Sequence, residues 1–424
     1  MRRDTMPRVA TLVLGVFGFV VPALAGILDT SKNILNLKNG DGDSDSDVLP
    51  GKYIISLKPD IDIGVHLNWV QNVHKRSLSR RGTLTAGLEK LFGFEGFNGY
   101  AGEFDDEVIA LITANENVLA VEPDKVARVA STTQRDAPWG IASLSSRSKP
   151  ANGYALGHNY CYDESAGAGT YAYVLDSGVL TNNSEFEGRA IKGYNSWADT
   201  ESFDDHFGHG THVAGTIASK TYGVAKKATV VDVKVVRGEG YSTVSHVLDG
   251  INWAVNNISS TPGRASKSVI NISLEFSCSS ALNNAVNAAA SFLGILSVVA
   301  AGNDGASASE TSPASASSAL TVGAVSWDRT RASWSNYGRD VDVFAPGVDI
   351  PSLWNAEGAE TYSSGTSMAA PHVAGLVLYL KGLEKEGLDR PAEAVARVKE
   401  LATADVVVDA GTGSPNLLAY NGIV

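Results

Sequence analysis

Cysteine is scarce in this sequence. Only two of its 424 residues, Cys161 and Cys278, carry a thiol, and neither belongs to a catalytic motif with histidine. A cysteine nucleophile is therefore disfavoured, because such a thiol needs a base to activate it. Residue spacing does not give the geometry of the two thiols, so both a disulfide and two free thiols stay open.

Positive charge is also scarce. The chain has 34 lysines and arginines against 46 aspartates and glutamates, a formal net charge of −12, and no long basic run. Proteins that bind nucleic acid neutralise phosphates with clustered lysine and arginine, so nucleic acid is not expected as a partner. The hydrophobic fraction of 44% is enough for a sizeable core and argues against wholesale disorder.

Apolar runs long enough to span a membrane are lacking as well. The run Val9–Val21 follows three arginines, precedes the small-residue cleavage motif Ala23-Leu24-Ala25, and is too short for a comfortable span. We therefore predict a signal peptide at residues 1–25, the alternative being an N-terminal anchor. An acidic spacer, 26–47, contains GDGDSDSD. We expect a secreted, extracellular protein without a membrane partner.

Residues 48–130 have the pattern of a small α+β domain. The strand pattern GKYIISLKP ends at a proline, and a helical stretch follows over about 65–77. VIALIT is then predicted as a strand, followed by a short helix and by the strand VLAVEPD.

Residues 131–424 have a different pattern, beyond the polar segment ASTTQRDAPWG. Apolar runs of strand length, such as YAYVL, ATVVDVKVV, SVVAA and LTVGAV, alternate with helical patterns. Continuous apolar strands separated by helices are typical of a parallel sheet that is covered on both faces. We predict one α/β domain with such a sheet and helices on both sides.

Four polar residues of this domain follow strands or begin helices. Asp176 directly follows YAYVL, Asn303 closely follows SVVAA, His209 precedes the helical stretch THVAGTIAS, and Ser367 lies in GTSMAAPHVAG. Histidine suits proton transfer near neutral pH, and a helix N-terminus offers free N–H groups to an oxyanion. Each residue also has a structural reading: a helix cap, a turn, or close packing of a helix start.

The segment DDHFGHGTH has a competing interpretation as a zinc site. His206, His209 and His212 are spaced by threes, with Asp204 and Asp205 beside them. Histidine and carboxylate clusters bind zinc. The intervening glycines break a regular helix, however, so the three rings need not share a face.

The catalytic candidates occur in the order Asp176, His209, Ser367, which is the order found in subtilisin. LDSGV, GHGTHVAGTIAS, SVVAAGN and SGTSMAAPHVAG resemble the four blocks of the subtilisin-like serine proteases. YDESAG, KTYGVAKKA, SWSNYG and SPNLLAYNG resemble the fungal proteinase K branch. The resemblance covers nearly all of residues 131–424, and residues 48–130 resemble the inhibitory propeptide of that family.

The resemblance implies a secreted serine endopeptidase that is made as a zymogen. Ser367 would attack the peptide carbonyl, His209 would carry the proton, and Asp176 would orient the imidazole. The side chain of Asn303 and the backbone N–H of Ser367 would bind the oxyanion. The expected partners are protein and peptide substrates and the chain's own propeptide, cut near Ala130-Ser131, and we expect a monomer.

Substrate is expected to bind as an added strand, as is usual in this family. The residues that the resemblance assigns to substrate binding are Gly238, Gly240, Tyr241, Ser273, Leu274, Glu275, Ala300 and Gly302. One segment departs from the family pattern, because SLEFSC stands where SLGG is typical. Our hypothesis is that Glu275 favours a basic side chain near the cut. The alternative is that Glu275 and Phe276 point away from the cleft.

The resemblance implies no cofactor for the chemistry and a structural calcium ion. Its ligands would be the Asp342 carboxylate and the backbone oxygens of Ser317 and Ala319, since calcium prefers oxygen.

N-x-[ST] sequons predict glycosylation at Asn182, Asn257 and Asn271, although the last lies in the strand-like run VINISL.

Two other classes of function stay open. One is a catalytically silent relative that binds peptides, and the other is the zinc hydrolase. A lipase or esterase is disfavoured, because no G-x-S-x-G elbow surrounds Ser367.

Overall fold

The structure is a computed structural model that describes residues 48–59, 61–81, 85–125, 131–151, 153–155, 157–384 and 387–423. The predicted signal peptide, the acidic spacer and Ala130 at the predicted cleavage site lie outside these ranges. The chain divides into two compact units between residues 127 and 128, close to the predicted domain boundary. None of the helices in the part described is long and apolar enough to cross a membrane.

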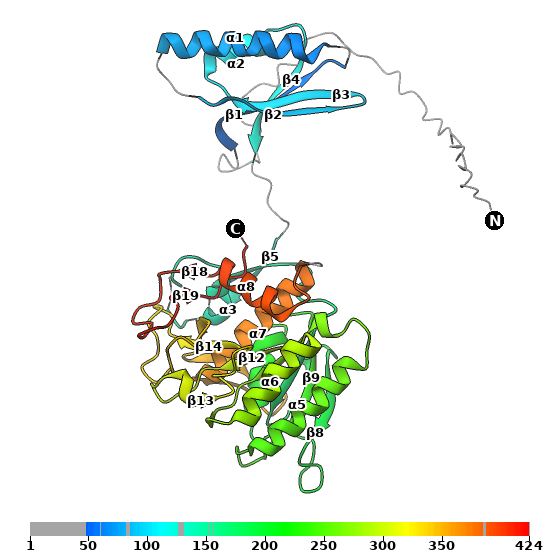
Figure 1. Ribbon diagram of the computed structural model, residues 1–424, viewed down its shortest axis with the longest axis vertical. Helices are drawn as coiled ribbons and strands as arrows, with labels where there is room; N and C mark the ends of the chain where they lie inside the picture. The colour runs from blue at the N-terminus through cyan, green and yellow to red at the C-terminus, as the bar shows by residue number, and fades with distance from the viewer. Residues whose placement is uncertain are drawn as a thin grey trace, which may run out of the picture. The chain divides into compact units, whose positions relative to one another are not determined.

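The N-terminal unit is a four-stranded antiparallel sheet with two helices on one face (Figure 1). Its elements are β1 (Val48–Leu57), α1 (Ile63–Arg81), β2 (Gly87–Phe94), β3 (Phe97–Glu103), α2 (Asp106–Thr113) and β4 (Val118–Lys125), and the strand order is β2-β3-β1-β4. Ile55, Tyr100 and Ile112 lie in its buried core.

One prediction for this unit is wrong, because VIALIT belongs to helix α2 rather than to a strand. Asp105 caps the helix by accepting a hydrogen bond from the backbone N–H of Val108 at 2.9 Å, and Asp106 and Glu107 lie in the first turn. Acidic residues at this position stabilise a helix N-terminus. The α+β class stands, with the hairpin β2-β3 as an additional element.

The C-terminal unit is built on a nine-stranded sheet of order β18-β19-β15-β14-β12-β10-β7-β9-β8. All neighbouring strands in it are parallel except β18 and β19. Its strands are β7 (Tyr171–Asp176), β8 (Ala190–Asn195), β9 (Thr229–Lys234), β10 (Ser268–Ile272), β12 (Leu296–Ala300), β14 (Leu320–Val325), β15 (Val343–Pro346), β18 (Thr403–Ala404) and β19 (Leu417–Leu418).

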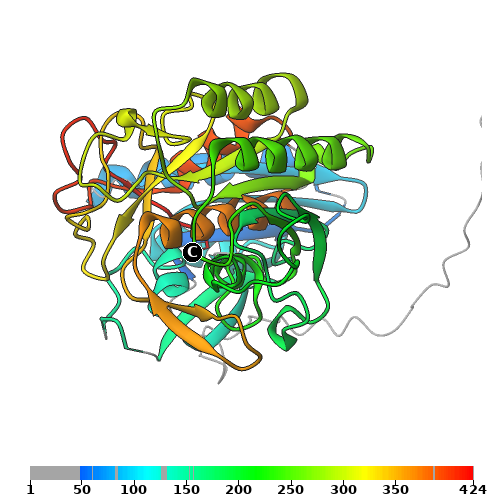
Figure 2. The ribbon, with the colours of Figure 1, turned by 90° about the horizontal axis from the view of Figure 1, so that it is seen from below.

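Helices cover both faces of this sheet. They are α3 (Trp139–Leu144), α4 (His209–Ala218), α5 (Val244–Ser259), α6 (Ser280–Leu293), α7 (Thr366–Leu383) and α8 (Pro391–Leu401). Figure 2 shows α5 and α6, in green, on one side and α7, in orange, on the other. Short antiparallel pairs complete the unit: β5 (Ser131–Ala137) with β6 (His158–Asp163), β11 (Phe276–Ser277) with β13 (Thr311–Ser312), and β16 (Ile350–Leu353) with β17 (Glu360–Ser363).

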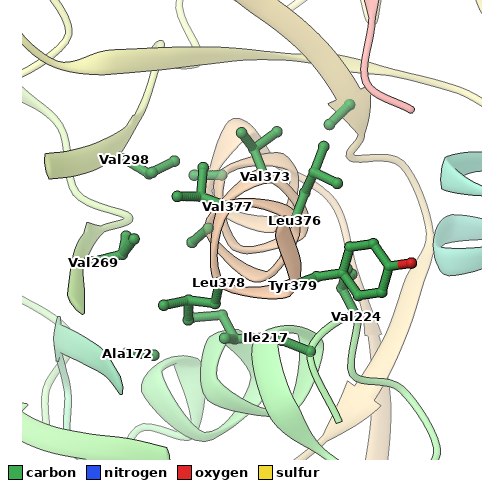
Figure 3. Packing of buried hydrophobic residues seen from close by; sticks show 14 of the residues in the cluster. Ala172, Ile217, Val224, Val269, Val298, Val373, Leu376, Val377, Leu378 and Tyr379 are labelled. Carbon is green, nitrogen blue, oxygen red and sulfur yellow. The ribbon is translucent and has the colours of Figure 1, made fainter. Parts of the chain in front are cut away.

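Each strand of the sheet contributes to two cores. In β7, Ala172 and Val174 pack towards α4 and α7, whereas Tyr173 and Leu175 pack towards α5 and α6. Figure 3 shows the first core around α7, with strand valines on one side and Ile217 of α4 on another. Alternate residues of a strand point to opposite faces, so a sheet covered on both faces needs apolar residues throughout. The predicted α/β class is confirmed.

Candidate active site

Asp176 and His209 form a hydrogen-bonded pair. Asp176 is the last residue of β7 and is fully buried, and its Oδ1 lies 2.8 Å from Nδ1 of His209. Because a carboxylate only accepts, Nδ1 carries the proton and Nε2 keeps its lone pair. Oδ1 also accepts from the backbone N–H of Ser177 at 2.7 Å. The imidazole side chain is 21% exposed, so its free nitrogen is able to reach a reacting group.

The proton affinity of His209 is set by two opposing effects. Burial disfavours the charged ring, but the charge and hydrogen bond of Asp176 outweigh it, and the charge of Asp205 adds to them. The pKa of His209 therefore lies above its usual value. A base of this kind binds a proton more tightly than free imidazole does.

Asp205 organises the turn before α4, a role that sequence reasoning missed. Its Oδ1 accepts from the Ser177 hydroxyl at 2.8 Å and from the backbone N–H of Gly208 at 2.7 Å. Its Oδ2 accepts from the backbone N–H and hydroxyl of Thr211, at 2.9 and 2.6 Å. One buried carboxylate thus ties the helix that begins at His209 to the end of β7. Its position just before a helix start was the available signal.

Ser367 is the second residue of α7 and is paired with Ser273, the residue after β10. The Ser367 hydroxyl donates to the Ser273 carbonyl at 3.0 Å, and the Ser273 hydroxyl donates to the Ser367 carbonyl at 2.9 Å. Pro371, inside α7, explains the second bond. Proline has no N–H, so the carbonyl four residues earlier, that of Ser367, lacks its helical donor. Among the hydrogen bonds of the described residues, none joins Ser367 to His209.

The sheet register nevertheless brings the two groups to one edge. Strands β10 and β7 are parallel neighbours, with Asn271 opposite Val174, and two residues further along this register sets Ser273 beside Asp176. Ser367 is bonded to the first of these residues and His209 to the second. The carboxyl ends of parallel strands are where ligands bind in open α/β sheets.

Asn303, three residues beyond β12, is also held at this edge. Its Oδ1 accepts from the backbone N–H of Thr366 at 2.8 Å and from the Thr366 hydroxyl at 3.0 Å. The Thr366 hydroxyl in turn accepts from the N–H of Gly302 at 3.1 Å. A backbone N–H only donates, so the Oδ1 assignment is fixed, and Nδ2 is left free to donate elsewhere.

Glu275 accepts a hydrogen bond from this NH₂ group, which has two N–H donors. Its Oε2 accepts from Nδ2 of Asn303 at 3.1 Å and from the backbone N–H of Asn303 at 2.9 Å. The alternative that Glu275 points away from the cleft is therefore wrong. Phe276, by contrast, packs against the core formed with α5 and α6.

Of the other residues expected to bind substrate, Gly238, Gly240 and Tyr241 lie in a turn. This turn contacts the loop that leads to His209. The backbone N–H groups of Arg237 and Gly240 close this turn. A Cβ on Gly240 would lie 2.6 Å from the Phe207 ring, and that ring lies 6.4 Å from the His209 ring between centroids. Leu274 packs against the core, and Ala300 is buried at the end of β12.

The zinc interpretation is wrong, because the three histidines have different partners. His206 is exposed, with Nε2 3.0 Å from the Ser202 hydroxyl, whereas the ring of His212 is buried against the carbonyl of Ile350 at 2.9 Å. Burial lowers the pKa of His212 to about 4. Within the described ranges, no group of three or more histidine, cysteine, aspartate or glutamate side chains could hold a metal ion.

The residues predicted to bind calcium do not fit the ion. Oδ2 of Asp342 accepts from the backbone N–H of Thr321 at 2.9 Å, and Oδ1 pairs with the ammonium of Lys399 at 2.5 Å. Thr321, to which the carboxylate is bonded, lies two residues after Ala319 and four after Ser317 in the sequence. A lysine ammonium, however, already neutralises the charge that calcium would need.

Replacing Lys399 with methionine should lower the melting temperature by a few degrees. The side chains of Lys399 and Asp342 are 39% and 18% exposed, so the pair is worth about 1 kcal/mol or less. Thermal unfolding should be followed in a Ser367→Ala background, which prevents autolysis. A chelator should leave the parent protein unchanged, and millimolar calcium should stabilise only the Lys399→Met variant. A parent protein that a chelator destabilises would contradict this assignment.

The structure also bears on the sequons and the thiols. Asn182 is exposed, and Asn257 on α5 accepts a hydrogen bond from the Tyr173 hydroxyl at 2.6 Å. Asn271 is fully buried in β10, so the prediction of a glycan there is wrong.

Cys161 and Cys278 are both free thiols, which resolves the open disulfide question.

The family models match both units of the chain. The model of the subtilase family matches residues 167–415, and the model of peptidase inhibitor I9 matches residues 52–130. The first covers more than half of the sequence and contains Asp176, His209, Asn303 and Ser367.

Curated relatives match over most of their length. Alkaline protease 1 of Aspergillus flavus is 52% identical over 383 residues, which are 88% of this chain and 92% of the relative. Subtilisin-like proteinase Mp1 of Magnaporthiopsis poae is 46% identical over 415 residues, 95% of this chain and 96% of the relative. A crystal structure of a cold-adapted subtilisin-like serine proteinase matches with a TM-score of 0.61 and 38% identity, over 68% of this chain and 98% of that one. The chain therefore belongs to the subtilase family of serine proteases, with an N-terminal I9 inhibitor domain.

Proposed function

We propose that this subtilase is a secreted serine endopeptidase, made as a zymogen, that hydrolyses peptide bonds in proteins through Asp176, His209 and Ser367. The observation that carries the proposal is the 2.8 Å bond from His209 Nδ1 to the buried Asp176 carboxylate. This bond leaves Nε2 as a base at the sheet edge where the Ser367 hydroxyl lies. A base oriented by a carboxylate is what a serine nucleophile needs.

In the proposed reaction, Ser367 turns its hydroxyl from the Ser273 carbonyl to Nε2 of His209. As Ser367 Oγ attacks the peptide carbonyl carbon, Nε2 takes its proton, and the imidazolium is stabilised by Asp176. The imidazolium then protonates the leaving amine, which departs and leaves an acyl-enzyme. Water attacks the ester with His209 again as base, and the acid product and Ser367 are released.

The negative oxygen formed during attack needs hydrogen-bond donors. The backbone N–H of Ser367, at the start of α7, is one candidate, and the Nδ2 group of Asn303 is the other. The bonds from Thr366 hold the Asn303 amide in the donating orientation. Preorganised donors of this kind stabilise the transition state more than the ground state.

The zymogen part of the proposal rests on the I9 inhibitor domain. A parallel sheet requires non-local pairing and folds slowly, so a small domain that docks on it could speed folding and then block the cleft. We place the cut near Ala130-Ser131 and propose that the enzyme makes it itself. The signal peptide at residues 1–25, secretion, a monomeric state and glycans on Asn182 or Asn257 belong to the same proposal.

Self-processing provides the test. Wild type should be secreted with an N-terminus near Ser131, and Ser367→Ala should keep residues 48–130 covalently attached, as intact mass and N-terminal sequencing would show. Ser364→Ala is a matched control, because this hydroxyl is bonded to Asp349 rather than to the proposed site. Identical processing of wild type and Ser367→Ala would contradict autocatalytic cutting.

A further inference from the structure

The amide that the proposed function gives to the oxyanion is already bonded to a carboxylate of the same chain. Oε2 of Glu275 accepts both the side-chain and the backbone N–H of Asn303, at 3.1 and 2.9 Å. A Cβ on Gly302 would lie 3.3 Å from Oε1 of Glu275, so the carboxylate also covers Gly302. A negatively charged oxygen on this donor resembles the oxyanion of the reaction.

The amide of Asn303 cannot avoid this contact by turning over. Its Oδ1 is held by two donors of Thr366, one of which is a backbone N–H. A flipped amide would set its NH₂ group against that N–H and lose both bonds. The NH₂ group has two N–H donors and the carboxylate takes one, so an oxyanion on the other would form beside a second negative oxygen until Glu275 leaves.

The backbone of Glu275 is anchored, so only its side chain is free to move. Leu274 and Phe276, on either side, pack against the core. Phe276 also begins β11, which pairs with Ser312 of β13. The glutamate side chain has several rotatable bonds, and rotation about them moves the carboxylate without disturbing these contacts.

No cation among the described residues lies within ion-pairing distance of this side chain. Among the residues that the structure describes, no ion pair involves Glu275 or its neighbour Asp304. Partial burial, and then the hydrogen bond and charge of Asp304, raise the pKa of Glu275. A cation brought to this place would relieve the repulsion between the two carboxyl groups.

We propose that Glu275 is a specificity-determining residue, whose carboxylate lies on the Asn303 amide in the free enzyme and is drawn off it by a lysine or arginine side chain just before the cleaved bond. This inference rests on the proposed function. The carbonyl that must reach Asn303 belongs to the residue before the cut, and its side chain starts one atom away. A basic side chain there can pair with the displaced carboxylate, whereas an apolar one cannot. The proposed self-cut near Ala130-Ser131 lacks this pairing, and its rate depends instead on the tethering of the propeptide to the enzyme.

Peptide substrates that differ only in this residue test the proposal. The processed enzyme should hydrolyse the lysine and arginine peptides with at least tenfold higher kcat/KM than the leucine peptide, a factor expected from one hydrogen bond to a charged group. Glu275→Gly should raise kcat/KM for the leucine peptide by about tenfold and lower it for the basic peptides. Glu275→Gln should lose only the preference for basic peptides, without the rise in kcat/KM for the leucine peptide. Glu310→Gln, which removes one charge from an exposed residue, should behave as wild type.

A binding measurement separates occupancy of the donor from general damage. A peptide aldehyde with leucine at its end forms an oxyanion with the nucleophile, so it should bind Glu275→Gly about tenfold more tightly than wild type. Melting temperatures within a few degrees of wild type would confirm that the variants fold.

Unchanged aldehyde affinity and an unchanged order of substrates in both Glu275 variants, with wild type active, would overturn the Glu275 proposal alone. No hydrolysis by wild type and by Glu275→Gly alike would overturn the proposed function, and the Glu275 proposal with it. Hydrolysis by Glu275→Gly alone, with wild type inactive on the basic peptides, would support the proposed function and overturn the release of Asn303 by a basic side chain.

Discussion

Ser367→Ala should lower kcat for peptide hydrolysis by about 10⁶-fold, the size of the effect for the catalytic serine of subtilisin. The variant keeps the Asp176–His209 pair and the Asn303 donor, but it has no oxygen that can form the acyl-enzyme. What remains should be slow attack by water, helped by the oxyanion donors. KM should change little, since the lost hydroxyl is bonded to Ser273 within the chain.

The measurement requires equal processing, because a variant that keeps its propeptide would be inhibited for a different reason. A trace of wild-type enzyme can remove the propeptide from the variant, and an irreversible serine reagent can then inactivate this added wild-type enzyme. Ser364→Ala, carried through the same steps, should keep full activity. A loss of less than about 100-fold in Ser367→Ala would assign the nucleophile to another group.

Asp176→Asn should lower kcat by about 10⁴-fold and also change the pH dependence. The factor is that known for the equivalent change in a serine protease of another fold. An asparagine amide can donate to Nδ1, which favours the imidazole tautomer with its proton on Nε2, where it cannot act as base. The loss should therefore appear in kcat while the fold persists.

The pH profile has a definite sign. His209 works as a base when neutral, so kcat/KM rises with pH as the ring loses its proton. In wild type, Asp176 holds the pKa of His209 above its usual value, so this rise should be centred above pH 6.5. In Asp176→Asn, burial remains and the raising charge is gone, so the rise should move to lower pH. Asp249→Asn on α5, where the carboxylate accepts from Tyr194, is the control and should leave the profile in place. A profile that does not move in Asp176→Asn would contradict the pairing.

The class of fold is readable from the sequence because burial on both faces leaves a plain signature. Strand β7 alternates between two cores, so all of Tyr171–Leu175 had to be apolar or aromatic. Helix α2 was missed for the opposite reason. VIALIT consists mostly of residues favoured in strands, and the cap at Asp105 overrides that preference.

The candidate site could be predicted only in part. Asp176, His209 and Ser367 follow strands or begin helices, and parallel topology gathers such positions at one edge. The Lys399–Asp342 pair could not be foreseen, because it joins a helix and a loop far apart in the chain. The contact between Glu275 and Asn303 was not predicted either. Sequence showed that a glutamate replaced a glycine, but the direction of its side chain depends on where β10 and β12 end.

The most direct test of the central claim is the mass of the Ser367 peptide after treatment with an organophosphorus fluoridate. This reagent phosphorylates a serine that a neighbouring base has activated and leaves ordinary hydroxyls alone. We predict one adduct per chain, located on Ser367 by fragmentation, that forms as activity disappears and is absent from Asp176→Asn on the same timescale. Full loss of activity with the adduct on another residue, or full activity with Ser367 modified, would contradict the account.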